Sequence, residues 1–123
     1  MTEKRLALGA WGEDQAAGYL KKQGMKILAR NFSTPVGEID IIAQYKNWIV
    51  FVEVKTRRST VFGTPQEAVG QRKQQQIIRT AQWYLQSNRS GKLQPRFDVV
   101  AILCQSDDNA EITHLPNAFS LAN

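Results

Sequence analysis

Residues 37–57, with the sequence GEIDIIAQYKNWIVFVEVKTR, restrict the fold more than any other part of the chain. Apolar residues fill two runs on either side of the polar pair Lys46-Asn47. Two short apolar runs separated by two polar residues are typical of a β-hairpin. The pattern therefore predicts two antiparallel strands, residues 37–45 and 48–56, at the core of a sheet.

Charged side chains interrupt this hairpin at its open end. With the turn centred on the polar pair, the register places Asp40 opposite Glu53 and Glu38 opposite Lys55. Strand alternation directs these four side chains to one face of the hairpin. The other face is apolar and is predicted to join the core; it comprises Ile39, Ile41, Ala43, Val50, Val52 and Val54.

The two opposed carboxylates need compensation. Their Cβ atoms would lie about 5 Å apart, where two negative charges repel by about 3 kcal/mol at an effective dielectric constant of about 20. Lys55 would compensate them, and so would a divalent cation such as Mg²⁺, with the Val54 carbonyl near enough to be a third ligand. The alternative is a solvated charge cluster on an exposed face. A solvated face would be polar along its whole length, but Ile42, Ile49 and Phe51 share this one. We therefore favour a functional site.

A helix predicted over residues 4–23 adds a further carboxylate. Its apolar residues recur at three- and four-residue spacing, and Gly24 provides a stop signal. Glu13 lies on the same stripe, which runs through Leu6, Ala10, Ala17 and Leu20. A carboxylate that faces a sheet needs a partner, whereas one at a helix edge reaches solvent. Beside the hairpin carboxylates, Glu13 becomes a candidate fourth member of the site.

The remaining segments complete an α/β pattern. A basic loop with Gly, Pro and Ser is predicted to follow the hairpin at residues 57–65. A second helix is predicted over residues 66–87. Three further strands are predicted over residues 25–32, 96–104 and 111–119. The resulting order, α-β-β-β-α-β-β, indicates a single domain over residues 1–123, with a mixed central sheet flanked by helices.

The composition narrows the class of protein. Sixteen Lys and Arg against eleven Asp and Glu give a net charge of +5, which favours polyanions such as nucleic acid, although many small proteins that bind none carry a similar charge. The single Cys104 excludes an internal disulfide and a cysteine-rich zinc site. The longest wholly apolar run, residues 48–52, is far too short to span a bilayer. We expect a cytoplasmic protein without a membrane partner.

Several ordered sequence blocks resemble a known family. Asp40 followed by Glu53-Val54-Lys55 resembles the PD-(D/E)xK nuclease superfamily, and Glu13 on the preceding helix makes the chain similar to the archaeal Holliday-junction resolvases. A closer resemblance, over about residues 9–103, is to the YraN-like family of small bacterial proteins. It is carried by the blocks WGEDQAAGYL, ILARNF, GEIDIIA, FVEVKTR, RKQQQIIRTAQWYL and RFDVVAI.

The resemblance implies a restriction-endonuclease-like core with a metal-dependent nuclease site. Asp40 and Glu53 would then hold one or two Mg²⁺ or Mn²⁺ ions, and Glu13 would support the site directly or through water. Lys55 would position or activate the attacking water and stabilise the phosphate in the transition state. The turn proline of the superfamily is absent before Asp40. This chain has Glu38-Ile39 there, and Glu38 is an accessory residue that either orients Lys55 or faces solvent.

Four basic residues are placed to contact phosphates of a nucleic acid. Arg57 and Arg58 leave the second hairpin strand, and Arg72 and Lys73 open the second helix. Lys73 lies one turn before Ile77 on the inward stripe, so we also predict it as an accessory site residue. The alternative for all four is ordinary solvated surface.

The sequence shows no aromatic side chains placed to stack with the bases of a single-stranded nucleic acid, because Trp48 and Trp83 are predicted in the core. His114 is predicted to be structural.

The expected function is a Mg²⁺-dependent endonuclease that acts on DNA, including branched or repair intermediates. The alternative is a catalytically silent module that binds nucleic acid or a protein partner on the same fold. The presence together of Asp40, Glu53 and Lys55 favours the enzyme. A small-molecule phosphohydrolase ranks last, because the chain has no Gly-rich phosphate cradle. A homodimer stays open.

Overall fold

The computed structural model describes residues 3–58, 69–88, 91–106 and 109–120. Within them the order α-β-β-β-α-β-β is confirmed. Neither helix in these ranges is long and apolar enough to cross a membrane. The elements are α1 (Glu3–Lys22), β1 (Lys26–Thr34), β2 (Gly37–Tyr45), β3 (Trp48–Arg57), α2 (Gln71–Ser87), β4 (Gln94–Ser106) and β5 (Asn109–Phe119).

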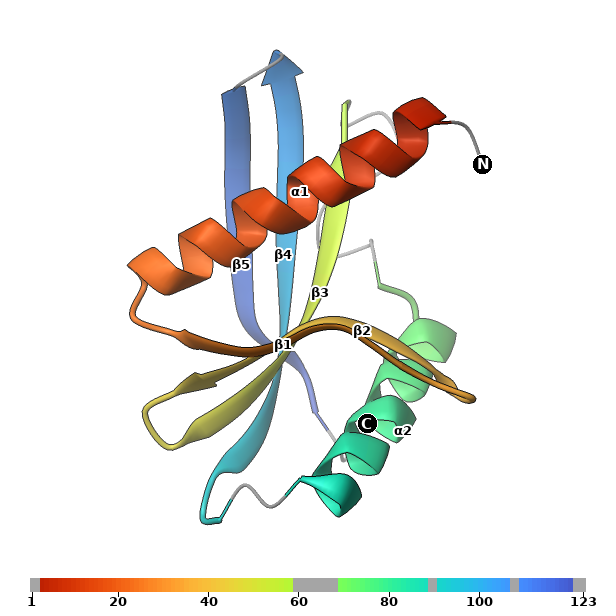
Figure 1. Cartoon of the computed structure of the whole chain (residues 1–123), viewed down its shortest axis with the longest axis vertical. Coiled ribbons are helices and arrows are strands. Elements are labelled where there is room, and N and C mark those ends of the chain that lie inside the picture. Colours follow the sequence, from red (N-terminus) through yellow and green to blue (C-terminus); the bar gives the residue numbers. More distant parts are fainter. Residues whose placement is uncertain (1–2, 59–68, 89–90, 107–108, 121–123) are drawn as a thin grey trace.

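The five strands form one mixed sheet in the order β1-β2-β3-β4-β5. The first three strands form an antiparallel meander, β3 and β4 are parallel, and β5 returns antiparallel to β4. Parallel neighbours need a crossover connection, and the segment that contains α2 supplies it. Helix α1 runs across β3, β4 and β5, whereas α2 lies on the other face of the sheet (Figure 1).

Each face of the sheet carries its own core. On β3, Val50 and Val52 pack toward α1, and Ile49 and Phe51 pack toward α2. This alternation explains why the strand is apolar throughout its first half: it is buried on both faces. The helices contribute Ala16, Ala17 and Leu20 to the first core, and Ile77, Ile78 and Ala81 to the second.

The predicted hairpin register is confirmed next to the turn. β2 and β3 pair from Tyr45 and Trp48 to Ile41 and Val52, as a turn at Lys46-Asn47 requires. Lys46 has a φ of 53°, the left-handed conformation that such a tight turn uses. The pairing then ends, so the strands separate at the end that carries the charged residues.

One predicted core face is wrong at this point. Ile39 was expected beside Ile41 and Val52, but it packs with the α2-side core, whereas Ile41 packs with the α1-side core. Strict alternation holds for a regularly paired strand, and β2 twists where its pairing with β3 ends. Figure 1 shows β1 and β2 curving together away from β3 toward α2.

Other predictions also need correction. Leu6 is 58% exposed because the N-terminal end of α1 projects beyond the sheet (Figure 1). Trp48 and Trp83 are 38% and 43% exposed, so neither is a core residue. Helix α2 begins at Gln71 rather than at residue 66, and residues 59–68, which include most of the predicted basic loop, lie outside the described ranges.

Candidate active site

The candidate active site lies where β2 separates from β3. Beyond the last paired residues, the Val54 N–H donates a hydrogen bond of 2.8 Å to Oδ2 of Asp40. This bond holds the Asp40 carboxylate between the separating strands. Because the N–H and C=O of one strand residue point to the same side, the Val54 carbonyl faces the same opening. Both groups are therefore available to one ligand.

Glu53 is the buried carboxylate of the site. It is only 6% exposed, and its carboxyl group, when protonated, is close enough to Asp40 for a hydrogen bond that favours the protonated form. Its Oε2 atom is buried with no hydrogen-bond partner among the described residues. Burial, followed by the hydrogen bond and the charge of Asp40, raises the pKa of Glu53 to about 8. The predicted closeness of Asp40 and Glu53 is thus present, although the two residues are not a regular ladder pair.

Two lysines lie near Glu53. Lys73 of α2 brings its Nζ atom to 3.5 Å from Oε2, which is an ion-pair distance without the geometry of a hydrogen bond. The charges of Lys73 and of Lys55 on β3 both favour ionised Glu53, but burial outweighs them. Lys73 therefore contacts a carboxylate of the site, and Lys55, two residues after Glu53 on the same strand, acts on it through its charge.

Glu13 reaches the same opening from α1. The residue before it, Gly12, lies against β3 so closely that a Cβ there would be 1.8 Å from Oγ1 of Thr56. Partial burial, followed by the charge of Asp40, raises the pKa of Glu13, while Arg30 acts in the opposite direction. The Asp40 charge therefore acts on Glu13. Since Glu13 comes from α1 and Lys73 from α2, helices from both faces of the sheet contribute to the site.

The donor set fits a hard divalent cation. Mg²⁺ prefers carboxylate and carbonyl oxygens and keeps several waters. A cation beside Oε2 of Glu53 would satisfy that atom and offset its repulsion with Asp40. In the part of the chain that the structure describes, no three His, Cys, Asp or Glu side chains are gathered as a ligand set. The ligands on offer are thus Asp40, Glu53 and the Val54 carbonyl.

Glu38 does not occupy its predicted place. It was expected opposite Lys55, but β2 has already left β3 there, and no ion pair joins the two residues. Instead, the Ser33 hydroxyl of β1 donates to Oε2 of Glu38 at 3.3 Å. Glu38 is exposed, and its charge contributes to the raised pKa of Glu13. Its influence on the site is therefore electrostatic.

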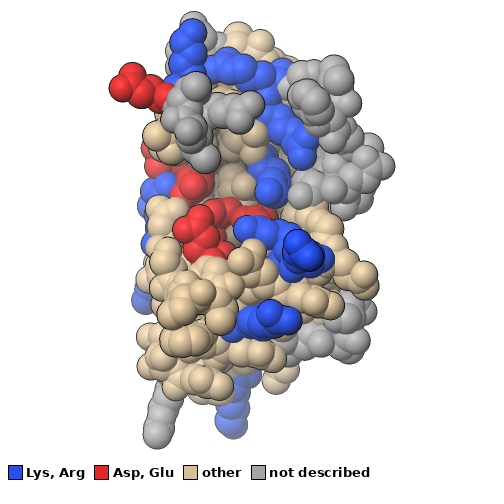
Figure 2. Space-filling model, turned by 90° about the vertical axis from the view of Figure 1, so that its right-hand side faces the viewer, with Lys and Arg blue, Asp and Glu red and all other residues tan. Residues whose placement is uncertain are grey.

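The arginines that are predicted to contact phosphates differ in their exposure. Arg72 is exposed at the start of α2, and Arg57 is half-buried at the end of β3. Arg58 is exposed and donates to the Cys104 sulfur at 3.9 Å, toward β4. Figure 2 shows acidic side chains gathered in the middle of one face, with Lys and Arg side chains above and beside them. This face thus combines an acidic centre with a basic border.

A groove of about 310 Å³ adjoins the carboxylates, between the β1–β2 turn and α2. Gly37 closes it at one side: its φ of 153° and a Cβ that would lie 2.7 Å from Cγ of Gln76 both require glycine. Glu38 and Lys73 lie in the wall of the groove. The groove therefore leads from solvent to the lysine that contacts Glu53.

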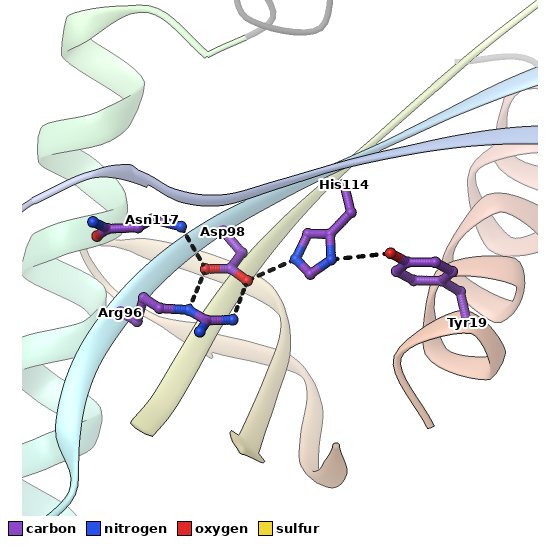
Figure 3. Close-up of polar contacts among 5 residues, drawn as sticks. All are labelled: Tyr19, Arg96, Asp98, His114 and Asn117. Atoms are coloured by element: carbon purple, nitrogen blue, oxygen red, sulfur yellow. Dashed lines mark hydrogen bonds and ion pairs between the residues drawn. The ribbon is translucent and has the colours of Figure 1, made fainter. Parts of the chain in front are cut away.

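Sequence reasoning missed a second buried carboxylate, Asp98 of β4. Arg96 donates to both its oxygens at 2.9 and 2.8 Å, His114 Nε2 lies 2.7 Å from Oδ2, and the Asn117 N–H donates to Oδ1 at 3.0 Å (Figure 3). Burial raises the pKa of Asp98, but these hydrogen bonds outweigh it and the net pKa is lowered. Tyr19 Oη lies 3.2 Å from His114 Nδ1. An aspartate inside an apolar strand, two residues after an arginine, was the available sequence signal.

The chain is similar to proteins of one family over most of its length. The profile of the Uncharacterised protein family UPF0102 matches residues 12–102, which include every residue of the carboxylate site. A UPF0102 protein of Syntrophotalea carbinolica is 60% identical over 121 residues, covering 98% of each chain. One of Trichlorobacter lovleyi is 51% identical over 117 residues, covering 94% of this chain and 92% of the relative. The chain therefore belongs to the UPF0102 family, the YraN-like group of the PD-(D/E)xK superfamily.

Proposed function

We propose that this protein is an endonuclease, dependent on Mg²⁺ or Mn²⁺, that hydrolyses phosphodiester bonds in DNA, with branched or repair intermediates as the substrates to test first. The observation that carries the proposal is Oε2 of Glu53, buried beside Asp40 without a hydrogen-bond donor in the described part of the chain. An unsatisfied buried carboxylate is costly, so a purely structural one would have donors. Membership of the YraN-like group supports the same chemistry.

Each residue of the site has a role in this proposal. Asp40, Glu53 and the Val54 carbonyl would hold the cation, and Glu13 would support it through water. The cation would neutralise charge on the phosphate and acidify a water molecule. Lys55 would orient the attacking water and meet the negative charge that develops on the phosphate.

Lys73 and the other basic residues would bring the substrate to this centre. Lys73 lies 3.5 Å from Oε2 of Glu53 and favours the ionised form that a cation would bind, and it lines the groove beside the carboxylates. Arg57, Arg58 and Arg72 would contact phosphates on either side of the scissile bond. Because these contacts are to the backbone, they would fix the strand in place without reading its sequence.

The test begins with metal binding and ends with cleavage. Calorimetric titration with Mn²⁺ is expected to show binding to the parent protein and its loss in Asp40→Asn and Glu53→Gln. Labelled linear, nicked, flapped and four-way DNA is then incubated with Mg²⁺ or Mn²⁺. We expect cleavage by the parent and none by these two variants. Glu3→Gln is the matched control, because Glu3 is an exposed acidic residue in the first turn of α1, away from the carboxylate site.

Two results would contradict the proposal in different ways. Metal bound elsewhere, with Asp40→Asn unchanged, would remove the site. Tight binding of branched DNA without cleavage, with either metal and on every substrate, would favour the binding module instead. RNA is included in the panel because the 2′-hydroxyl distinguishes the two nucleic acids.

A further inference from the structure

Helix α1 contacts the sheet over only part of its length. Leu6, Ala7 and Ala10 near its N-terminal end are exposed, and the first residue described as buried is Gly12. Apolar burial then continues through Ala16, Ala17 and Leu20. Glu13 therefore lies at the boundary between the projecting end of the helix and its packed end. Its position depends on how the packed end is fixed.

Besides the apolar packing and the Asp14–Arg30 ion pair to β1, two contacts on one face of α1 hold its packed end on different strands. Gly12 lies against Thr56 of β3, and Tyr19 lies against His114 of β5. Seven residues are close to two full turns, so Gly12 and Tyr19 share one face of the helix about 10 Å apart. Two separated contacts on one face define both the tilt of a helix and its rotation about its own axis.

The Tyr19 contact belongs to a chain of hydrogen bonds that ends at Asp98 (Figure 3). The Asp98 carboxylate only accepts, so Nε2 of His114 carries the proton that faces it. Nδ1 then accepts from the Tyr19 hydroxyl when the ring is neutral, and donates to it when the ring is charged. The link therefore holds in either charge state, and Arg96 and Asn117 fix Asp98 independently.

A small rotation of α1 would displace Glu13. A helix with its side chains has a radius of about 5–6 Å, so a rotation of about 10° moves a side-chain end by about 1 Å. A displacement of that size is enough to spoil a catalytic arrangement. We infer that the Tyr19–His114–Asp98 chain positions Glu13 toward Asp40, which makes Tyr19 and His114 positioning residues of the carboxylate site. This inference rests on the proposed function for its catalytic consequence, but its geometric part does not.

Tyr19→Phe is the sharpest variant, because it removes only the hydroxyl. The ring keeps its edge contact with His114, whose ring centroid lies 5.5 Å away at 89°. Tyr84→Phe is the matched control on the other helix. Tyr84 also packs edge-on, against Phe51 at 6.0 Å, and its hydroxyl makes no hydrogen bond within the described residues.

The first experiment needs neither metal nor substrate. Crystal structures of the parent, Tyr19→Phe and Tyr84→Phe are compared for the separation of the Glu13 and Asp40 carboxylates. We expect Tyr19→Phe to shift Glu13 by about 1 Å or spread it over several conformers, and Tyr84→Phe to leave it in place. An unmoved Glu13 in Tyr19→Phe would overturn the inference.

The second experiment is a double-mutant cycle on Mn²⁺ affinity, measured by calorimetry, with thermal unfolding of every variant recorded. Tyr19→Phe is expected to weaken binding about tenfold, as loss of an outer partner does, and to add nothing in a Glu13→Gln background. An equal loss in both backgrounds would mean that Tyr19 does not act through Glu13. If the parent binds no Mn²⁺ and cleaves no DNA, the proposed function fails, while the crystal structures still decide the positioning.

Discussion

Two carboxylates are buried on neighbouring strands of this sheet, in opposite surroundings. Glu53 of β3 has an oxygen that no described residue supplies with a hydrogen-bond donor, and its pKa is raised to about 8. Asp98 of β4 is 0% exposed, accepts hydrogen bonds at both oxygens, and has a lowered pKa. One environment disfavours the charge and the other secures it. Burial alone therefore does not mark a functional carboxylate; the supply of donors does.

The largest expected difference between the two carboxylates is in the free energy of unfolding. Asp98→Asn should lower the free energy of unfolding by about 3–5 kcal/mol, because it leaves Arg96, whose side chain is only 12% exposed, without its counter-charge. Glu53→Gln should change it by less than about 1 kcal/mol at pH 7, because a side chain with a pKa of about 8 is already mostly protonated. Urea denaturation without metal measures both. Equal losses would break the comparison.

Turnover, unlike stability, should depend on the residues around Glu53. Lys55→Ala is expected to reduce cleavage by about two to three orders of magnitude, because Lys55 would meet charge that develops in the transition state. DNA affinity should change little, since one charge among several contributes modestly. Lys26→Ala, an exposed change at the start of β1, serves as the control. A folded Lys55→Ala protein that cleaves at the parental rate would refute this role; melting with and without Mg²⁺ checks its stability.

The two carboxylates should also give opposite pH dependences. Between pH 4.5 and about 8, the folded protein keeps a proton on Glu53 that the unfolded chain has lost, so stability falls as the pH rises. The contribution of Asp98 is present above pH 3.8 and is lost as the pH falls through its lowered pKa. Urea denaturation across pH, without metal, should be flatter between pH 5 and 8 for Glu53→Gln. The same slope as the parent would contradict this assignment.

The smallest effect concerns the basic border of the site. DNA affinity should fall with salt, and Arg72→Ala should reduce the log–log slope by about 0.9 if Arg72 contacts one phosphate. Lys22→Ala, an exposed change at the C-terminal end of α1, should leave the slope unchanged. Affinity measured by fluorescence anisotropy at several salt concentrations gives both slopes. An unaltered slope in Arg72→Ala would place Arg72 away from the DNA.

Local pattern was sufficient for the hairpin and insufficient beyond it. The turn at Lys46-Asn47 sets the pairing of its neighbours, so the bounds of β2 and the register next to the turn follow from sequence. Ile39 was misplaced because alternation assumes a regularly paired strand, and β2 leaves its partner at Asp40. The start of α2 was misplaced because Val69 is buried like a helix residue but precedes the helix.

The same limit applies to the two carboxylates. Asp40, Glu53 and Lys55 lie close in the sequence, so their proximity could be inferred from one hairpin. Asp98 has one local partner, Arg96, but its other partners, His114 and Asn117, come from β5. His114 in turn contacts Tyr19 of α1. Whether a buried carboxylate is satisfied depends on such distant residues, which periodicity does not reveal.

The path of the chain also bears on the order of folding. The β1–β2–β3 meander joins neighbours in sequence, so loop closure costs it little entropy. The hydrogen bond between Tyr19 and His114 spans 95 residues and needs β4, β5 and α1 in place. Contacts of such long range are expected late. The acidic opening of the hairpin would therefore form first, and the link that orients α1 would close only when the two ends of the protein meet.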